Sequence, residues 1–270
     1  MEPILPLLSP SDTLERRLRR VLEVHQLSVC RVPTWSLLRE LAAGADAIVM
    51  DGEALDDPGD ASDLFRLSAL NPTAALVLVV PVRALPRLSS TLPTHCDVLA
   101  LPIDLPNMGS RVARSRFLGW ARRMHRRIQL AEHIPFLARL ALREALRVHA
   151  PAVGQSECPS RVTSMNQVAH NIGVSRGHLS GVLSRADVRL RQVMDAWVVV
   201  QAHMLRRYER LPWERIAWRL GYASLSGLSD AFRRSVGDRL READQVGPEA
   251  RLRWFEVEVL DQLVQLPPAN

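Results

Sequence analysis

Lysine is missing from this chain, and all 35 of its basic residues are arginine. Cysteine is scarce: Cys30, Cys96 and Cys158 form no C-x-x-C pair and no histidine lies at metal-ligand spacing, so neither a disulfide framework nor a metal centre is indicated. No apolar run approaches the ~18 residues that span a bilayer. The N-terminus has apolar residues with an acid, not the basic region that leads a signal peptide. We therefore expect a cytoplasmic protein that binds no membrane.

A catalytic constellation is also missing from the sequence. The 8 histidines are dispersed along the chain, and no nucleophile, base and orienting group come together in a motif. We expect no enzyme activity, no catalytic residues, no metal and no cofactor.

At 270 residues, 47% of them hydrophobic, the chain can fill about two ordinary domain cores. Charge divides unevenly along it. Residues 1–105 carry 9 Arg against 14 Asp and Glu, a net of −5, whereas residues 106–270 carry 26 Arg against 15, a net of +11. A codon bias toward arginine would explain the missing lysine but not this asymmetry. Attraction to nucleic-acid phosphates is the economical explanation of the basic half.

Short apolar runs alternate with helical periodicity over residues 1–105. The five runs that read as buried strands are Ile4–Leu8, Leu27–Val32, Ala47–Met50, Ala75–Val80 and Val98–Leu101. Between the first two, Leu14, Leu18 and Leu22 fall on one face of a helix, and two further helical patterns follow. This alternation predicts an α/β domain built on a doubly wound, five-stranded parallel sheet of the flavodoxin-like type.

The third predicted strand resembles a known family. Its sequence, Asp46-Ala-Ile-Val-Met-Asp51, is similar to the third strand of response-regulator receiver domains, which ends in the aspartate that accepts a phosphoryl group. Leu101-Pro102 stands where that family has Lys-Pro. The resemblance implies a receiver-like fold for residues 1–105 and makes Asp51 the candidate phosphoacceptor.

Aspartyl phosphorylation needs further parts: acidic ligands for Mg²⁺, a hydroxyl that senses the phosphate and a lysine that pairs with it. The chain has Ser9 and Pro10 at the acidic pair, Val80 or Pro81 at the hydroxyl and Leu101 at the lysine. We therefore expect a degenerate receiver-like domain that does not run phosphoryl chemistry. Asp51 is then expected as a solvated carboxylate at the crevice where the strands end, and not as a phosphoacceptor.

An arginine-rich segment follows this domain. Residues 106–130 contain seven arginines and no acid, and their apolar residues recur at helical steps, which predicts a helix that closes the receiver-like domain. A second helix over 135–148 is interpreted as a strut between domains or a dimer seam. The segment 106–150 is thus a closing helix and strut, and 151–162, with Pro151, Gly154 and Pro159, is the predicted linker.

One supersecondary unit occurs twice between Val168 and Phe232. Ala169 and Ala217 lie 48 residues apart, as do Gly173 and Gly221, and Leu179 and Leu228 lie 49 apart. In each copy the alanine lets two helices approach, the glycine can end the first helix, and a serine, Ser175 or Ser224, caps the second. Two related helix-turn-helix units are therefore predicted, and in such units the second helix enters a DNA major groove.

The second copy resembles one regulator family in detail. The stretch Gly221-Tyr-Ala-Ser-Leu-Ser-Gly-Leu-Ser-Asp-Ala-Phe-Arg-Arg-Ser-Val-Gly237 is similar to the signature of AraC/XylS transcription regulators. The matching positions are Gly221, Tyr222, Ser226, Ser229, Ala231, Phe232 and Gly237, while Leu228 and Val236 replace phenylalanines. The resemblance covers about Thr163–Leu240. It implies an all-α DNA-binding domain over 163–246, in which a long helix, here Leu190–Tyr208, joins two helix-turn-helix units.

Candidate DNA contacts follow from this placement. They are Ser175, Arg176, His178, Ser180 and Arg185 in the first unit and Ser224, Ser226, Ser229, Arg233 and Arg234 in the second. Arginines and helix N-terminal amides suit phosphate oxygens. Few side chains are available to hydrogen-bond with base edges, because Gly177, Ser180 and Gly181 occupy outward positions of the first predicted reading helix. In the second, Asp230 stands where the family commonly has an arginine.

Three tryptophans and a C-terminal helix complete the predictions. Trp197, Trp213 and Trp218 fall on apolar helix faces and are expected in the core. Residues 247–270 add an amphipathic helix, from Pro248 to about Leu266, that the family pattern lacks. This helix either packs back on the DNA-binding domain or forms a dimer contact.

Taken together, these features predict a bacterial DNA-binding transcription regulator of the AraC/XylS type with a phosphorylation-incompetent receiver-like domain for regulation or dimerisation. Double-stranded DNA is the expected partner, and a second copy of the chain, RNA polymerase or another signalling protein are further candidates. The alternative is a signalling adaptor that binds protein partners and has weak or no sequence-specific DNA binding. The small and acidic residues on the reading helices motivate that alternative.

Overall fold

A computed structural model describes residues 4–55, 61–88, 92–147 and 164–264 of the chain. The chain divides into two compact units, Met1–Arg123 and Met124–Asn270. The division falls inside one long helix, α4 (Met108–Leu130). The predicted linker over 151–162 lies outside the described residues.

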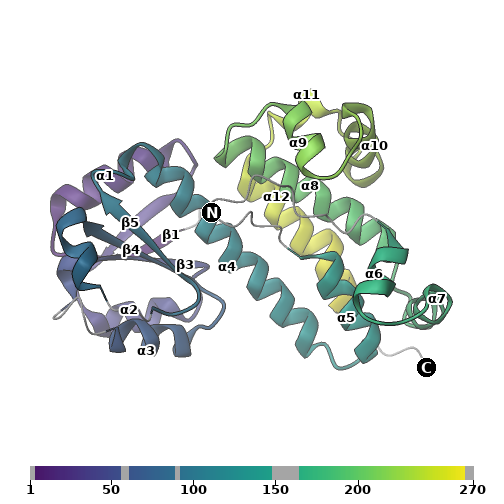
Figure 1. Ribbon diagram of the computed structural model, residues 1–270, viewed down its shortest axis with the longest axis horizontal. Helices are drawn as coiled ribbons and strands as arrows, with labels where there is room; N and C mark the ends of the chain where they lie inside the picture. Colours follow the sequence, from purple (N-terminus) through teal and green to yellow (C-terminus); the bar gives the residue numbers. More distant parts are fainter. Residues whose placement is uncertain (1–3, 56–60, 89–91, 148–163, 265–270) are drawn as a thin grey trace. The chain divides into compact units, whose positions relative to one another are not determined.

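Unit 1 is built on a five-stranded parallel sheet (Figure 1). Its strands are β1 (Ile4–Leu8), β2 (Ser28–Val32), β3 (Ala47–Asp51), β4 (Ala75–Pro81) and β5 (Cys96–Leu101), in the order β2-β1-β3-β4-β5. The central strands β3 and β4 read as continuous apolar runs because both of their faces are covered. The predicted five-stranded parallel sheet of a receiver-like domain is confirmed.

Helices cover both faces of this sheet. They are α1 (Asp12–Glu23), α2 (Trp35–Ala42), α3 (Ser62–Leu70) and the first part of α4, with α1 and α4 on one face and α2 and α3 on the other (Figure 1). Leu38 of α2 and Leu64 of α3 join a buried cluster with Ile48 and Leu76 of the sheet. The doubly wound arrangement therefore follows from alternating apolar faces that need burial.

The crossover between β4 and β5 has no α-helix among its described residues. A short 3₁₀ turn, η2 (Val82–Arg87), follows β4 instead. Two other 3₁₀ turns, η1 (Gly52–Ala54) and η3 (Leu105–Asn107), follow β3 and β5. The Leu101–Pro102 peptide bond at the end of β5 is cis.

Helix α4 lies closely against the sheet, as the prediction of a closing helix requires. A Cβ added at Gly119 would come within 1.7 Å of the Asp46 carbonyl oxygen, so only glycine fits at this crossing. The Asp46 carboxylate pairs with Arg116 at 3.6 Å and Arg123 at 2.6 Å. Arg116 and Arg123 therefore stabilise the packing of α4 on unit 1. The sequence alone had suggested a basic helix surface for them.

Unit 2 is entirely helical in its described residues. After the end of α4 come α5 (Phe136–Ala145), α6 (Met165–Asn171), α7 (Arg176–Arg185), α8 (Leu190–Tyr208), α9 (Trp213–Arg219), α10 (Leu225–Val236) and α11 (Leu240–Ala243). The chain closes with α12 (Pro248–Phe255), a π-helical stretch η4 (Glu256–Leu260) and α13 (Asp261–Val264). Helix α8 has the bounds that the sequence predicted for a long connecting helix.

Helix α8 forms the centre of unit 2, and 14 of its 19 residues are buried. Helix α5 contacts α6, α7 and α8, and α10 contacts both α8 and α9.

Trp197 of α8 is buried as predicted, and Trp213 is half-buried with its ring 5.7 Å from that of Phe232. The prediction for Trp218 is wrong. Its side chain is 63% exposed, because Ile216 and Ala217 supply the inward face of α9 and the next position points outward.

The C-terminal helix packs back on α8, which is the first of the two arrangements the sequence allowed. The ring of Phe255 lies 5.4 Å from that of Trp197. His203 of α8 donates from Nε2 to the Val246 carbonyl oxygen at 2.8 Å, and the buried guanidinium of Arg251 pairs with Asp238 at 2.7 Å. Polar contacts therefore accompany the apolar packing of this helix.

Candidate nucleic-acid interface

Asp51 lies at the end of β3 and is only 6% exposed. Its Oδ2 accepts a hydrogen bond from the Ser9 hydroxyl at 2.6 Å, and its Oδ1 accepts one from the Glu53 amide at 3.1 Å. Both carboxylate oxygens are therefore occupied by neutral donors. The expectation of a solvated carboxylate is wrong, because Asp51 is buried and bonded to Ser9, the residue that follows the neighbouring strand β1.

The surroundings of Asp51 contain none of the charged groups that phosphoryl transfer requires at the matching positions. Arg31 of β2 instead binds the loop after β1, donating from Nε to the Ser9 carbonyl at 2.9 Å and from Nη2 to the Pro10 carbonyl at 3.0 Å. Val80 fills the space beside Gly52, where an added Cβ would lie 2.6 Å from its Cγ1. Among the described residues, this end of the sheet is packed through the contacts of Ser9, Arg31 and Val80.

The repeated sequence units form two helix pairs, α6–α7 and α9–α10. Gly173 after α6 and Gly221 after α9 have φ angles of +74° and +76°, the left-handed conformation that ends each first helix. The hydroxyls of Ser175 and Ser224 accept hydrogen bonds from the amides of His178 and Gly227 and so cap α7 and α10. Figure 1 shows α7 and α10 on the same side of unit 2, with α8 running between the two pairs.

The outer face of α7 is small and polar. Leu179, Val182 and Leu183 are buried against the rest of the unit. The exposed residues are Arg176, Gly177, His178, Ser180, Gly181, Ser184 and Arg185, which include every contact predicted inside this helix. Arg185 donates from Nε to the Gly181 carbonyl at 3.2 Å, so its guanidinium lies along the helix. This face offers serines and arginines, but few long side chains that could reach base edges.

The outer face of α10 carries mixed charge. Ser226 is exposed and its hydroxyl lies 2.8 Å from that of Ser224, whereas Ser229 is half-buried. Arg233 is exposed at 66% and lies 3.9 Å from the carboxylate of Asp230 one turn earlier. An exposed pair at this distance contributes little to stability, so Arg233 can exchange its partner for another anion.

Arg234 belongs to a cluster that the sequence analysis did not find. The Asp195 carboxylate of α8 is 8% exposed, and its Oδ2 accepts hydrogen bonds from Nε of Arg234 at 3.0 Å and from Nε of Arg191 at 3.3 Å. The bond to Asp195 raises the pKa of Arg234 above its ordinary value. Arg191 and Asp195 have the i, i+4 spacing of a helical ion pair, which is a signal in the sequence, but the partner on α10 lies 39 residues away.

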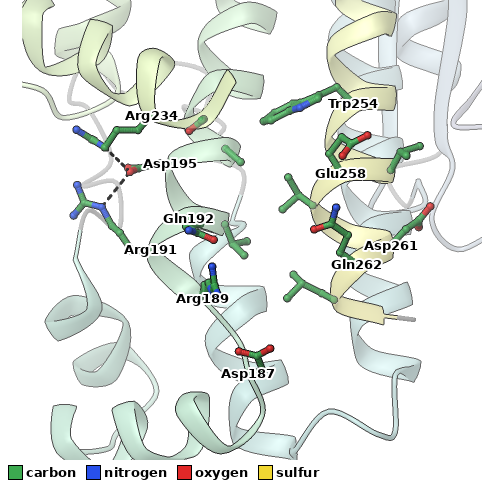
Figure 2. A pocket seen from close by; sticks show the side chains of 16 residues that line it. Asp187, Arg189, Arg191, Gln192, Asp195, Arg234, Trp254, Glu258, Asp261 and Gln262 are labelled. Atoms are coloured by element: carbon green, nitrogen blue, oxygen red, sulfur yellow. Dashed lines mark hydrogen bonds and ion pairs between the residues drawn. The ribbon is translucent and has the colours of Figure 1, made fainter. Parts of the chain in front are cut away.

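A groove of about 1610 Å³ runs along the start of α8. Figure 2 shows Arg191, Asp195 and Arg234 on one side of it and Trp254, Glu258, Asp261 and Gln262 of the C-terminal helix on the other. The Arg191 and Arg234 side chains meet at Asp195 on the side of α8 turned away from the C-terminal helix (Figure 2). The groove walls carry both signs of charge and include no cysteine, histidine or lysine.

Of the two cysteines in the described part of the chain, Cys30 is exposed and Cys96 is half-buried. Burial, and then the charge of Asp97, raise the pKa of the Cys96 thiol to about 12, so its thiolate is negligible at neutral pH. Within the four described ranges no three His, Cys, Asp or Glu side chains gather as they would around a metal ion. No helix there is both long and apolar enough to cross a bilayer. Cys158 lies outside the described residues.

Known proteins offer only distant likenesses to this chain. No protein family matches it, and no curated protein matches it. Among solved structures, full-length FixJ from B. japonicum is 12% identical, with a match covering 78% of this chain and 100% of FixJ at a TM-score of 0.36. The response regulator StyR is 13% identical, with a match covering 87% of this chain and 100% of StyR at a TM-score of 0.37. Neither match supports an inference about function at these TM-scores.

Proposed function

We propose that the chain is a DNA-binding transcription regulator of the AraC/XylS type, in which α7 and α10 enter adjacent major-groove segments of double-stranded DNA. The observation that carries this proposal is the pair of capped helix-turn-helix units separated by α8, within the half of the chain that has a net charge of +11. The receiver-like unit has a regulatory or dimerisation role that needs no phosphorylation.

The length of α8 supports this arrangement. Its 19 residues at ~1.5 Å each span about 28 Å, close to the roughly 34 Å between major-groove faces one turn apart. A rigid helix of this length sets the separation of the two units before DNA binds. Little ordering entropy then opposes simultaneous binding of both.

The surfaces of α7 and α10 favour phosphate contacts over base reading. Arg176, Arg185 and Arg233 are exposed, and the capped helix N-termini present backbone amides. Gly177 and Gly181 have no side chain for a base edge. We therefore propose a regulator whose affinity comes mainly from the DNA backbone, with few direct base contacts at Ser180, Ser226 and Ser229.

The second candidate function is a signalling adaptor that binds a protein partner through the same helices. The observation that favours it is the exposed Asp230 on α10, since a carboxylate on a reading helix repels phosphates. The two candidates differ in one measurable property, which is whether the purified chain selects DNA at all.

The test is selection of fragments from sheared genomic DNA by the full chain. Three proteins are compared: the wild type, the double variant Arg176→Ala and Arg233→Ala, and a control, Arg17→Ala and Arg20→Ala, which removes two exposed arginines from α1. We expect the wild type and the control to enrich the same short motif and the first variant to lose it. Equal enrichment by all three would place the contacts elsewhere, and no enrichment by the wild type would favour the adaptor.

A further inference from the structure

The buried carboxylate of Asp195 holds two arginines in one orientation. Both Arg191 and Arg234 bond it through Nε, and both bonds reach the same oxygen, Oδ2. The carboxylate is 8% exposed, whereas the side chains of Arg191 and Arg234 are 65% and 51% exposed. Each arginine is therefore fixed at its inner nitrogen, and its terminal nitrogens extend toward solvent.

This mode of anchoring prepares a guanidinium for an anion. An arginine has five N–H donors, and the bond through Nε uses one of them, leaving the fork of the two terminal nitrogens for a further acceptor. Fixing the inner nitrogen removes part of the side-chain freedom that a flexible arginine loses on binding. A phosphate oxygen matches the fork geometrically.

Arg191 also lies beside the first helix pair. Ser164, Met165, Asn166, Arg176, Arg191 and Met194 line one surface hollow of about 220 Å³. Arg191 thus shares this hollow with Arg176, at the N-terminus of α7, and shares a carboxylate with Arg234 of α10. Arg176 on α7, Arg191 on α8 and Arg234 on α10 thus form a row from one helix pair across α8 to the other.

We propose that Arg191 is a DNA phosphate contact located between the two helix-turn-helix units, and that Asp195 is the residue that positions it together with Arg234. This inference rests on the proposed DNA-binding function and adds to it a contact on the connecting helix. The phosphate bound there lies on the backbone between the two major-groove segments. The connecting helix then contributes to affinity directly, besides setting the separation of the two units.

The test compares DNA affinity and its salt dependence for the wild type, Arg191→Ala, Arg191→Lys and Arg253→Ala. Arg253 is an exposed arginine on α12 and serves as a control for the same loss of charge. The probe is a duplex selected by the wild-type protein, or a mixed-sequence duplex at low salt. Fluorescence anisotropy gives the dissociation constant at several salt concentrations, and thermal unfolding shows that each variant is folded.

We expect Arg191→Ala to weaken binding roughly tenfold, as loss of one charge-assisted hydrogen bond does, and to reduce the slope of log K against log salt by about 0.9. Arg191→Lys retains the slope because it keeps the charge, and Arg253→Ala matches the wild type. If Arg191→Ala equals Arg253→Ala, the contact on α8 is overturned while the proposed function stands. If the wild type binds no DNA, both fall.

A double-mutant cycle separates the positioning role of Asp195 from a purely structural one. In the Asp195→Ala background we expect Arg191→Ala to weaken binding by less than about threefold, since the arginine is no longer held in place. The same tenfold loss in both backgrounds would show that Arg191 binds phosphate without help from Asp195. Loss of stability without any change in coupling would give Asp195 a structural role alone.

Discussion

His203 is the most completely buried ionisable side chain of α8, with 0% exposure. Its Nε2 donates to the Val246 carbonyl, and its Nδ1 has no hydrogen-bond partner among the described residues. Burial first, and then the charge of Arg251, lower the pKa of His203 to about 4 from 6.5; Arg207 lowers it further, while the Val246 carbonyl and Asp244 raise it. The imidazole is therefore neutral in the folded protein at neutral pH.

This burial predicts a loss of stability in mild acid. The unfolded chain takes up a proton near pH 6.5 and the folded chain only near pH 4, so the stabilisation is complete above pH 6.5 and is lost as the pH falls toward 4. The difference corresponds to on the order of 3 kcal/mol. Urea unfolding at a series of pH values measures it, and His203→Gln should flatten that part of the profile. An unchanged profile in the variant would assign the pH dependence to other groups.

The contrast between two tryptophans gives a second prediction at this scale. Trp197 is 2% exposed and packs on Phe255, whereas Trp218 is 63% exposed. We expect Trp197→Ala to lower the free energy of unfolding by about 3–5 kcal/mol and Trp218→Ala by less than about 0.5 kcal/mol. Denaturant unfolding of both variants checks this. A large loss for Trp218→Ala would mean that its indole is covered by a partner under the conditions of the measurement.

At the scale of elements, α7 carries glycine where a helix prefers alanine. Gly177 and Gly181 lie within α7, and a Cβ added at either position would meet no atom within 4 Å. Glycine at such positions costs roughly 0.5–1 kcal/mol against alanine. By contrast, Gly173 has a φ of +74°, where alanine is strained although its Cβ would also meet no atom.

The same substitution is therefore expected to have opposite effects at neighbouring positions. Gly177→Ala should raise the free energy of unfolding by up to about 1 kcal/mol, and Gly173→Ala should lower it by about 1–2 kcal/mol. Thermal unfolding of the two single variants measures both. If Gly177→Ala is destabilising, the open space beside α7 is not present in solution.

For the whole molecule, the uneven charge predicts a steep dependence of DNA binding on salt. Each neutralised phosphate contributes a slope of about −0.9, so contacts from Arg176, Arg185, Arg191, Arg233 and Arg234 give roughly −4 to −5 in a plot of log K against log salt. Titration of a duplex between low and physiological salt measures this slope. A slope near zero would fit an adaptor that recognises protein, because no condensed counterions are then released.

The parts of the fold that could be predicted are those whose sequence signals lie within a few neighbouring residues. Continuous apolar runs of strand length, the i, i+4 apolar faces of α1, and the serine caps with their preceding glycines all lie within one or two turns of chain. The parallel sheet followed from the alternation of strands with helices, whereas the order of the strands comes from the structure. The bounds of α8 were expected from the resemblance to AraC/XylS regulators, which implies a long helix between the two units.

The candidate site was predictable only in part. The exposed positions of α7 follow from the capping serine and the helical period, because these two features determine which side chains turn inward. Asp51 and Arg234 could not be placed in this way. Their partners, Ser9 and Asp195, lie 42 and 39 residues away. Such pairs form only when distant helices or strands are brought together, so no short window of sequence contains them.

By itself, the sequence determined which segments are strands and helices, where helix-turn-helix units begin and end, and that positive charge gathers in the second half of the chain. These properties depend on backbone conformation, side-chain period and composition. Tertiary structure alone decided that Asp51 is buried and satisfied, that Trp218 faces outward, and that Asp195 binds two arginines, one from α8 and one from α10. The physical reason is that burial and ion pairing are properties of packed surfaces, and each surface here is assembled from segments far apart in the chain.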